Sequence, residues 1–365
     1  MGNDFDRKLV LADGSVYAGK GFGCPEDRFA ELVFNTSMAG YQEIISDPSY
    51  TDQAVVMTYP LMGNYGICPD DYESEVFGMC GLIVRQCCDT PSNFRCELTL
   101  DEALKAHGIA GISGIDTRMV TRHIRDVGSI KALITSAGRD TEDAIAAVHS
   151  WNPATDQVSR ASTKKAYELG EAEGSNPVVV IDCGIKKNII RMLQKRGFPL
   201  VIVPWDTDAD TIMGYDPAGI FVSNGPGDPK DCVPTIETIR RLRGRVPIFG
   251  ICLGHQMICL AYGAKTYKLK FGHRGGNHPV RNEKTGSIEI TSQNHSYAVV
   301  PESVAGTGLE ITHVNLLDGT VEGVECQKDM VFSVQYHPES SPGPCDSEYL
   351  FDRFYGNIRR RCRNA

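Results

Sequence analysis

The chain has 365 residues, of which 41% are hydrophobic and 23% are charged, and this balance excludes a disordered, collagen-like or coiled-coil protein. Its formal net charge of −9 argues against a nucleic-acid-binding protein, which usually carries a net basic field. No apolar run approaches the ~18 residues of a membrane span, and at about 150 residues per domain the length predicts two or three domains.

The beginning of the chain and its cysteines both indicate a cytoplasmic protein. Residues 1–8 are polar and lack the apolar stretch of a secretory signal peptide. The thirteen cysteines are an odd number at irregular spacings, without a Cys-x-x-Cys pair. We therefore expect free thiols in a reducing compartment and no structural metal, because no ligand spacing fits zinc.

The first part of the chain, residues 1–151, mixes strand and helix signals and predicts a mixed α/β domain. Asp13-Gly14 lies between two short apolar segments and predicts a β-hairpin. Thr99 and Glu102 have the spacing of a capping box, which predicts a helix start. Further strands are expected at 31–36, 53–58 and 81–85, and further helices at 116–125 and 141–150.

Residues 152–177 are polar without a sustained period and predict a linker, which separates the first domain from a second one at 178–365. In the second domain, short apolar strands alternate with amphipathic helices. This alternation predicts an α/β fold with a mostly parallel sheet flanked by helices. The expected strands are 178–181, 200–203, 219–222 and 246–251, the helices are 186–196, 235–242 and 255–262, and later strands are 288–291, 320–324 and 331–335.

The run Gly250-Ile251-Cys252-Leu253-Gly254 predicts a nucleophile elbow between a strand and a helix. In such a turn a strained backbone holds the nucleophile clear of the sheet, and glycines on both sides avoid collisions. The helix amino terminus favours a thiolate, and the N–H of Leu253 points to where an oxyanion would form. The alternative is that Cys252 is a buried core thiol.

A thiol nucleophile needs a base, and the base needs a group that orients it. His337-Pro338-Glu339 follows an apolar strand, and residues i and i+2 of an extended segment project to the same side. Glu339 can therefore hold the imidazole of His337 in one tautomer. Taken alone, the segment is also compatible with a simple turn, and His255 is an alternative base three residues after Cys252.

The loop Ser223-Asn-Gly-Pro-Gly-Asp-Pro229 follows another predicted parallel strand. Gly225 and Gly227 can bring backbone N–H groups close to a small ligand. They are candidates for a second oxyanion donor and for contacts to the substrate. The alternative is an ordinary Gly-Pro loop.

Together these motifs resemble the class I (triad) glutamine amidotransferases, and more specifically the family of small, glutamine-hydrolysing chains of carbamoyl phosphate synthetase. The resemblance covers almost the whole chain. Its amino-terminal motifs are absent from other amidotransferases. The motifs that carry it are Leu32-Val-Phe-Asn-Thr36, Gly40-Tyr-Gln-Glu43, Asp47-Pro-Ser-Tyr50, Asp116-Thr-Arg118, Phe271-Gly-His-Arg-Gly-Gly-Asn-His-Pro-Val280, Thr291-Ser-Gln-Asn-His295 and His337-Pro-Glu-Ser-Ser-Pro-Gly343.

The resemblance implies a role for each matched position. Cys252 would attack the glutamine amide and form a thioester, His337 would transfer protons, and Glu339 would orient His337. Backbone amides of Gly225 and Leu253 would bind the oxyanion. Contacts to glutamine would come from Ser49, Gly227, Gln256, Asn294, Ser296 and Tyr297. The family often has Gly where this chain has Ser296, so a positive φ there would strain the serine.

The resemblance also implies a partner and a pathway. A separate large chain would use the ammonia, with ATP and a divalent metal, to make carbamoyl phosphate from bicarbonate for arginine and pyrimidine biosynthesis. This chain would hold no cofactor, would bind glutamine but neither nucleic acid nor membrane, and would dock through its first domain as a heterodimer or a higher oligomer. Two alternatives remain: another amidotransferase or free-standing glutaminase or γ-glutamyl hydrolase, and a non-catalytic regulatory subunit.

Overall fold

The computed structural model describes residues 5–170 and 176–364, and the chain forms two compact units. The first unit comprises residues 1–154 with 270–274, and the second comprises 155–269 with 275–365. Residues 171–175 of the predicted linker lie outside the described residues. The rest of that segment contains α5 (Gln157–Ala161) and β10 (Tyr167–Leu169), which joins the sheet of the second unit.

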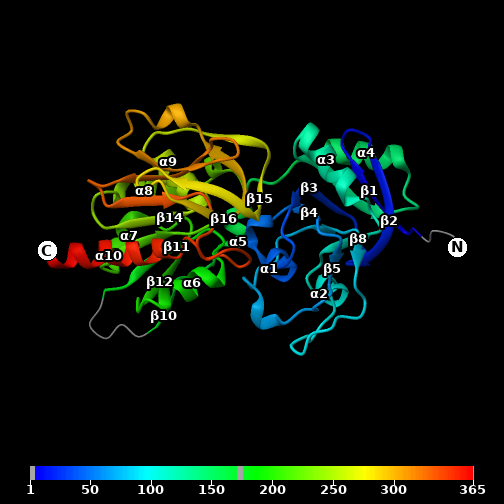
Figure 1. The fold of residues 1–365 in the computed structure, drawn as a ribbon, viewed down its shortest axis with the longest axis horizontal. Helices are drawn as coiled ribbons and strands as arrows, with labels where there is room; N and C mark the ends of the chain where they lie inside the picture. The colour runs from blue at the N-terminus through cyan, green and yellow to red at the C-terminus, as the bar shows by residue number, and fades with distance from the viewer. Residues whose placement is uncertain (1–4, 171–175, 365) are drawn as a thin grey trace. The chain divides into compact units, whose positions relative to one another are not determined.

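The first unit is built around a closed seven-stranded barrel (Figure 1). The predicted hairpin at Asp13-Gly14 is present, with Leu9 opposite Tyr17. The barrel closes because the last strand pairs with the first, Leu9 lying opposite Ile134 as well. In barrel order the strands are β1 (Arg7–Leu11), β2 (Val16–Gly23), β8 (Ala110–Ser113), β6 (Gly81–Ile83), β4 (Gln53–Met57), β3 (Arg28–Asn35) and β9 (Ile130–Ser136).

Helices cover this barrel, and the predicted capping box begins one of them. The Thr99 side chain accepts from the N–H of Glu102, and the Glu102 carboxylate accepts from the N–H of Thr99, so two otherwise unpaired donors are satisfied. The helices are α1 (Tyr41–Ser46), α2 (Leu100–Ala106), α3 (Thr117–Val127) and α4 (Thr141–Ser150), and shorter elements are η1 (Pro48–Tyr50), η2 (Pro69–Asp71), β5 (Leu61–Met62) and β7 (Gln86–Cys87).

The second unit contains a ten-stranded sheet in which five consecutive strands are parallel. This confirms the predicted α/β class, and antiparallel strands extend the sheet at both sides. In sheet order the strands are β10, β12 (Leu200–Pro204), β11 (Val178–Asp182), β13 (Gly219–Val222), β14 (Ile248–Ile251), β19 (Val331–Val334), β18 (Val321–Cys326), β16 (Ile288–Val299), β15 (Thr266–Asn282) and β17 (Glu310–Asn315).

The side chains of the parallel strands alternate between two apolar layers, as the period of a strand requires. Val179 and Ile181 belong to the core formed with α7, α8 and α9, whereas Val178 and Val180 belong to the core formed with α6 and α10. Figure 1 shows α8 and α9 on one side of the parallel strands and α6 on the other. Their bounds are α6 (Lys187–Gln194), α7 (Ala209–Gly214), α8 (Val233–Leu242), α9 (Leu253–Ala261) and α10 (Tyr349–Asn364), with short turns η3 (Pro229–Asp231) and η4 (Pro301–Val304).

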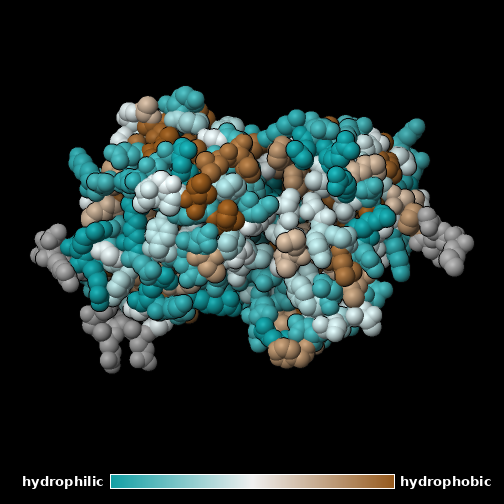
Figure 2. Space-filling model, viewed as in Figure 1, coloured by the Kyte–Doolittle hydropathy of each residue, from teal (hydrophilic) through white to brown (hydrophobic). Residues whose placement is uncertain are grey.

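The surface carries a mixture of residue types. On the face shown in Figure 2, hydrophilic residues predominate between smaller hydrophobic patches. Within the described ranges, no helix combines the length and the apolar character needed to cross a bilayer. In sheets of this kind, ligands bind at the carboxyl ends of the parallel strands. This edge of the second unit is therefore the expected place of a functional site.

Candidate active site

Cys252 lies at the junction of β14 and α9 with φ 54° and ψ −104°, so the strained backbone predicted for an elbow is present. The two flanking glycines lie where there is no room for a side chain. A Cβ on Gly254 would lie 2.2 Å from the backbone oxygen of Val222, and one on Gly250 would lie 2.5 Å from the end of Ile258. The sharp turn therefore depends on close packing of α9 against the sheet.

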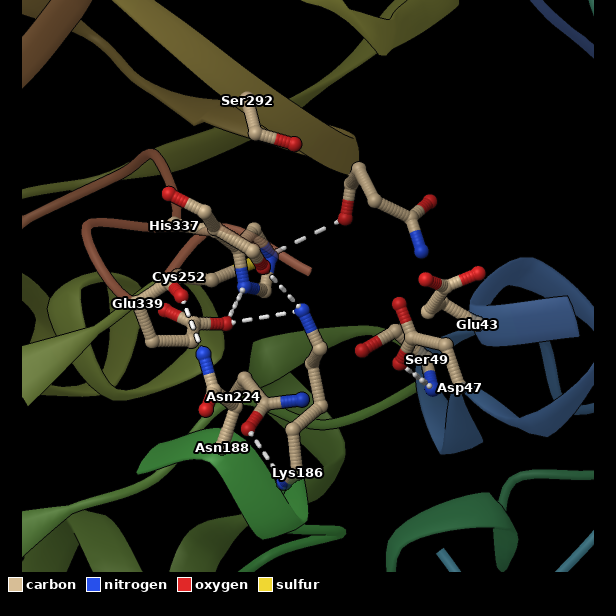
Figure 3. A network of polar contacts seen from close by, with 12 residues as sticks. Glu43, Asp47, Ser49, Lys186, Asn188, Asn224, Cys252, Ser292, His337 and Glu339 are labelled. Atoms are coloured by element: carbon tan, nitrogen blue, oxygen red, sulfur yellow. Dashed lines mark hydrogen bonds and ion pairs between the residues drawn. The ribbon is translucent and has the colours of Figure 1, made fainter. Parts of the chain in front are cut away.

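His337 and Glu339 follow β19 and form a buried pair. The Nδ1 atom of His337 lies 2.7 Å from the Oε1 atom of Glu339, and the two side chains are 2% and 0% exposed. This is the contact that the i, i+2 spacing predicts, and it leaves Nε2 as the ring atom available for proton exchange. Figure 3 shows the His337 ring beside Cys252.

The same carboxylate also binds a buried lysine. Lys186 Nζ lies 3.0 Å from Glu339 Oε1 and donates at 2.7 Å to the backbone oxygen of Ser340 (Figure 3). Lys186 was not identified as a site residue from the sequence, although its position at the start of a helix was a signal for such a role. A lysine at the amino-terminal end of a helix opposes the helix dipole, so it needs a specific partner.

The charges of this cluster set the pKa values of the pair. Burial favours the neutral form of Glu339, but the ammonium of Lys186 and the imidazolium of His337 outweigh it and lower the pKa of Glu339. Burial alone would lower the pKa of His337. The Glu339 carboxylate and the adjacent Cys252 outweigh this effect and raise the pKa of His337 above its usual range. The Glu339 carboxylate therefore stabilises the imidazolium that forms when His337 takes up a proton.

The thiol of Cys252 has a defined backbone neighbour. Its Sγ atom lies 3.6 Å from the backbone oxygen of Asn294 on β16, and the side chain is 2% exposed. The N–H of Gly254 donates to the backbone oxygen of Ser223 at 3.1 Å, which ties the first turn of α9 to the glycine loop after β13. The nucleophile candidate and the loop with Gly225 and Gly227 therefore lie at one edge of the sheet.

Both loop glycines occupy positions that a side chain would disturb. A Cβ on Gly225 would lie 2.2 Å from the backbone oxygen of Cys183. Gly227 has φ +89°, and a Cβ there would lie 2.8 Å from the Gln157 side chain. Glycine at both positions is therefore required by the packing of the loop against its neighbours.

The remaining predicted contact residues fall into both units. Gln256 on α9 uses its Nε2 atom to donate to the backbone oxygen of Tyr297 at 2.8 Å and to Gln335 at 2.9 Å, which leaves its oxygen for other donors. Ser296 lies within β16 and is not among the residues with positive φ, so the expected strain does not arise. Ser49 lies on η1 of the first unit, where its N–H donates to Asp47.

His255 does not fit the role of an alternative base. Its Nδ1 atom lies 2.9 Å from the hydroxyl of Ser333, and Nε2 is 4.0 Å from the sulfur of Cys259. Complete burial, with a smaller contribution from His313, lowers the pKa of His255 to about 3. His255 is therefore a neutral core residue beneath the elbow.

Two family models match the chain: "Carbamoyl-phosphate synthase small chain, CPSase domain" over residues 9–134, and "Glutamine amidotransferase class-I" over residues 179–357. The carbamoyl phosphate synthase small chain of Bacillus caldolyticus is 52% identical over 354 residues, which are 97% of this chain and 96% of that protein. The chain belongs to the carbamoyl phosphate synthase small chain family.

Other members are similar over nearly their full length. The small chain of Fusobacterium nucleatum subsp. nucleatum is 50% identical over 97% of this chain and 98% of that protein. A chain of Halalkalibacterium halodurans, described as a pyrimidine-specific small chain, is 51% identical over 95% of this chain and 96% of that protein. Membership makes this chain a glutamine amidotransferase subunit of a ligase, and a small chain implies a large-chain partner.

Proposed function

We propose that this subunit hydrolyses glutamine to glutamate and ammonia through Cys252, His337 and Glu339. The observation that carries the proposal is the strained elbow at Cys252 beside a base whose Nδ1 atom is held 2.7 Å from a buried carboxylate. A nucleophile, a base and an orienting group are the three parts that covalent amide hydrolysis requires.

In the first half of the reaction, the Cys252 sulfur attacks the side-chain carbonyl carbon of glutamine. The thiol proton goes to His337 Nε2, and the S–C bond gives a tetrahedral oxyanion. Backbone N–H groups of Gly225 and Leu253 stabilise the oxyanion, and one such donor contributes about 3–4 kcal/mol to a transition state. The C–N bond then breaks, His337 returns the proton to the leaving nitrogen, and ammonia and a thioester result.

In the second half, water attacks the thioester, with His337 as the base. The S–C bond breaks, the proton returns to Cys252, and glutamate leaves. Glu339 keeps Nδ1 of His337 protonated and Nε2 directed at the reacting atoms, while Lys186 keeps Glu339 ionised. Ser49, Gly227, Gln256, Asn294, Ser296 and Tyr297 contact glutamine in this proposal.

The ammonia passes to the large chain, which makes carbamoyl phosphate from bicarbonate with ATP and a divalent metal. The product serves arginine and pyrimidine biosynthesis in the cytoplasm, and the first unit docks to the large chain. This chain itself requires no cofactor for the glutaminase step.

The test is glutamate release from glutamine by wild type and by Cys252→Ser, each alone and with a carbamoyl phosphate synthetase large chain. We expect activity that needs Cys252 and rises with the large chain and ATP, while ammonia-dependent synthesis by the complex survives the substitution. Cys252-dependent activity that ignores the large chain would instead indicate a free-standing hydrolase. No glutamate release in any mixture would refute the proposal and leave a regulatory subunit.

A further inference from the structure

The segment that carries the proposed base has no regular secondary structure of its own. It runs from the end of β19 to the start of α10, over residues 335–348, and we call it the triad segment. Directly after Glu339, Ser340 and Ser341 have φ of 62° and 57°, a region that L-residues rarely occupy. The geometry of His337 and Glu339 therefore depends on contacts that other elements make to this segment.

One buried carboxylate contacts both ends of the triad segment. Glu289 on β16 is 6% exposed, and three hydroxyl groups donate to it. The Tyr336 hydroxyl lies 3.3 Å and the Ser347 hydroxyl 2.6 Å from Oε2, and the Tyr349 hydroxyl lies 2.8 Å from Oε1. Tyr336 directly precedes His337, whereas Ser347 lies at the far end of the segment and Tyr349 is the first residue of α10.

The same strand makes further bonds along the segment. The N–H of His337 donates to the backbone oxygen of Ser292 at 2.9 Å. The Ser292 hydroxyl donates to the backbone oxygen of Pro342 at 2.8 Å, and the N–H of Ile290 donates to Asp346 at 3.0 Å. Farther along β16, the backbone oxygen of Asn294 contacts the thiol of Cys252. Strand β16 thus contacts both the nucleophile and the segment that carries the base.

The chemistry of Glu289 distinguishes it from an ordinary core residue. Within residues 5–170 and 176–361, it forms hydrogen bonds to neutral hydroxyls and no ion pair. Burial of a carboxylate without an opposite charge costs stability. An apolar residue would avoid this cost, but it would not join the two ends of the segment.

We propose that Glu289 is a positioning residue that aligns His337 and Glu339 with Cys252 by tying both ends of the triad segment to β16. The inference rests on the proposed function, because it assigns Glu289 a role only through that base. Displacement of catalytic groups by about 1 Å can cost on the order of 100-fold in rate. Loss of the carboxylate therefore acts on kcat more than on binding of glutamine.

The experiment compares Glu289→Ala, which removes all three bonds, with Glu289→Gln, which keeps the shape and can bond to the same hydroxyls. Glu325→Gln is the matched control. Glu325 is a buried carboxylate on β18 that binds Lys284, Arg353 and Gln327, and among the described residues it forms no hydrogen bond or ion pair with the triad segment. Glutamate release by the complex with the large chain gives kcat and KM across pH, and circular dichroism gives the melting temperature.

For Glu289→Ala we expect kcat to fall about 10-fold to 100-fold with KM within about 3-fold of wild type. The acid limb of kcat should move to lower pH, because a looser Glu339 contact supports the imidazolium of His337 less. Glu289→Gln should restore kcat to within about 3-fold. Glu325→Gln should lower the melting temperature and leave kcat and its pH profile unchanged.

A folded Glu289→Ala protein with the kcat and pH profile of wild type would overturn the inference, as would equal kcat losses in the Glu325 control. If Glu289→Ala does not fold, the role of Glu289 is tested with Tyr349→Phe and Ser347→Ala. Each of these variants removes one hydroxyl and leaves the buried carboxylate in place. Unchanged kcat in both would overturn the inference. Absence of Cys252-dependent activity in wild type would instead refute the proposed function.

Discussion

Lys186→Met tests the part of the site that the sequence did not indicate. The substitution keeps the length of the side chain and removes the ammonium that lies 3.0 Å from Glu339 Oε1. Both groups are buried, with side chains 4% and 0% exposed, so water cannot replace the lost partner. Among the residues that the structure describes, Glu339 then keeps only His337 as an opposite charge.

The expected loss follows from this geometry. With an effective dielectric constant of about 20, two charges 3.0 Å apart attract by about 5–6 kcal/mol. Truncation of one partner of a buried pair costs about 3–5 kcal/mol. We expect the lower end, about 3 kcal/mol, because His337 still compensates the carboxylate. In a unit of about 200 residues, this corresponds to a fall of roughly 6–12 °C in melting temperature.

Thermal unfolding of the second unit, followed by circular dichroism, measures this loss. Lys195→Met is the control, since Lys195 is an exposed lysine at the end of the same helix. The pH dependence of the stability also has an expected direction. The lowered pKa of Glu339 stabilises the fold above the unfolded pKa of about 4.5, and this contribution is lost as the pH falls through the folded pKa. Without Lys186 the folded pKa is higher, so this contribution should be smaller and its loss should be complete at a higher pH. A melting temperature equal to that of Lys195→Met would refute the reasoning.

Three further outcomes are expected. Glu339→Gln should reduce kcat for glutamine hydrolysis less than His337→Asn, because proton transfer contributes about 10²–10⁴-fold and orientation less; the reverse order would contradict the assigned roles. Gly254→Ala should lower the melting temperature and abolish glutamate release, since its Cβ would lie 2.2 Å from the backbone of Val222; a fully active variant would show that the elbow tolerates displacement. His255→Asn should flatten the fall in unfolding free energy between pH 6.5 and 5 by about 1.4 kcal/mol per pH unit, measured by urea denaturation. The unfolded histidine takes up a proton in that range, whereas the buried His255, with its pKa lowered to about 3, does not; an unchanged slope would show that His255 is protonated in the fold.

The local features of the chain were predictable because they depend on neighbouring residues. The Asp13-Gly14 hairpin, the Thr99 capping box and the elbow at Cys252 are each specified within a few positions. The contact between His337 and Glu339 was predicted from an extended chain, but it is made across a turn, in which the N–H of Ser340 donates to the backbone oxygen of His337. The resemblance to the family also rests on such short motifs.

Only the tertiary structure decided which distant segments meet. The barrel closes through pairing of β1 with β9, more than a hundred positions apart, and Lys186 reaches a carboxylate 153 positions away. Glu289 joins a tyrosine, a serine and a second tyrosine through the order of strands in the sheet. Strand order is set by the summed packing of many side chains, so no local pattern of charge or hydrophobicity encodes these partners. The sequence by itself thus determined the reacting groups and their local geometry, and the fold determined the charges and anchors that hold them.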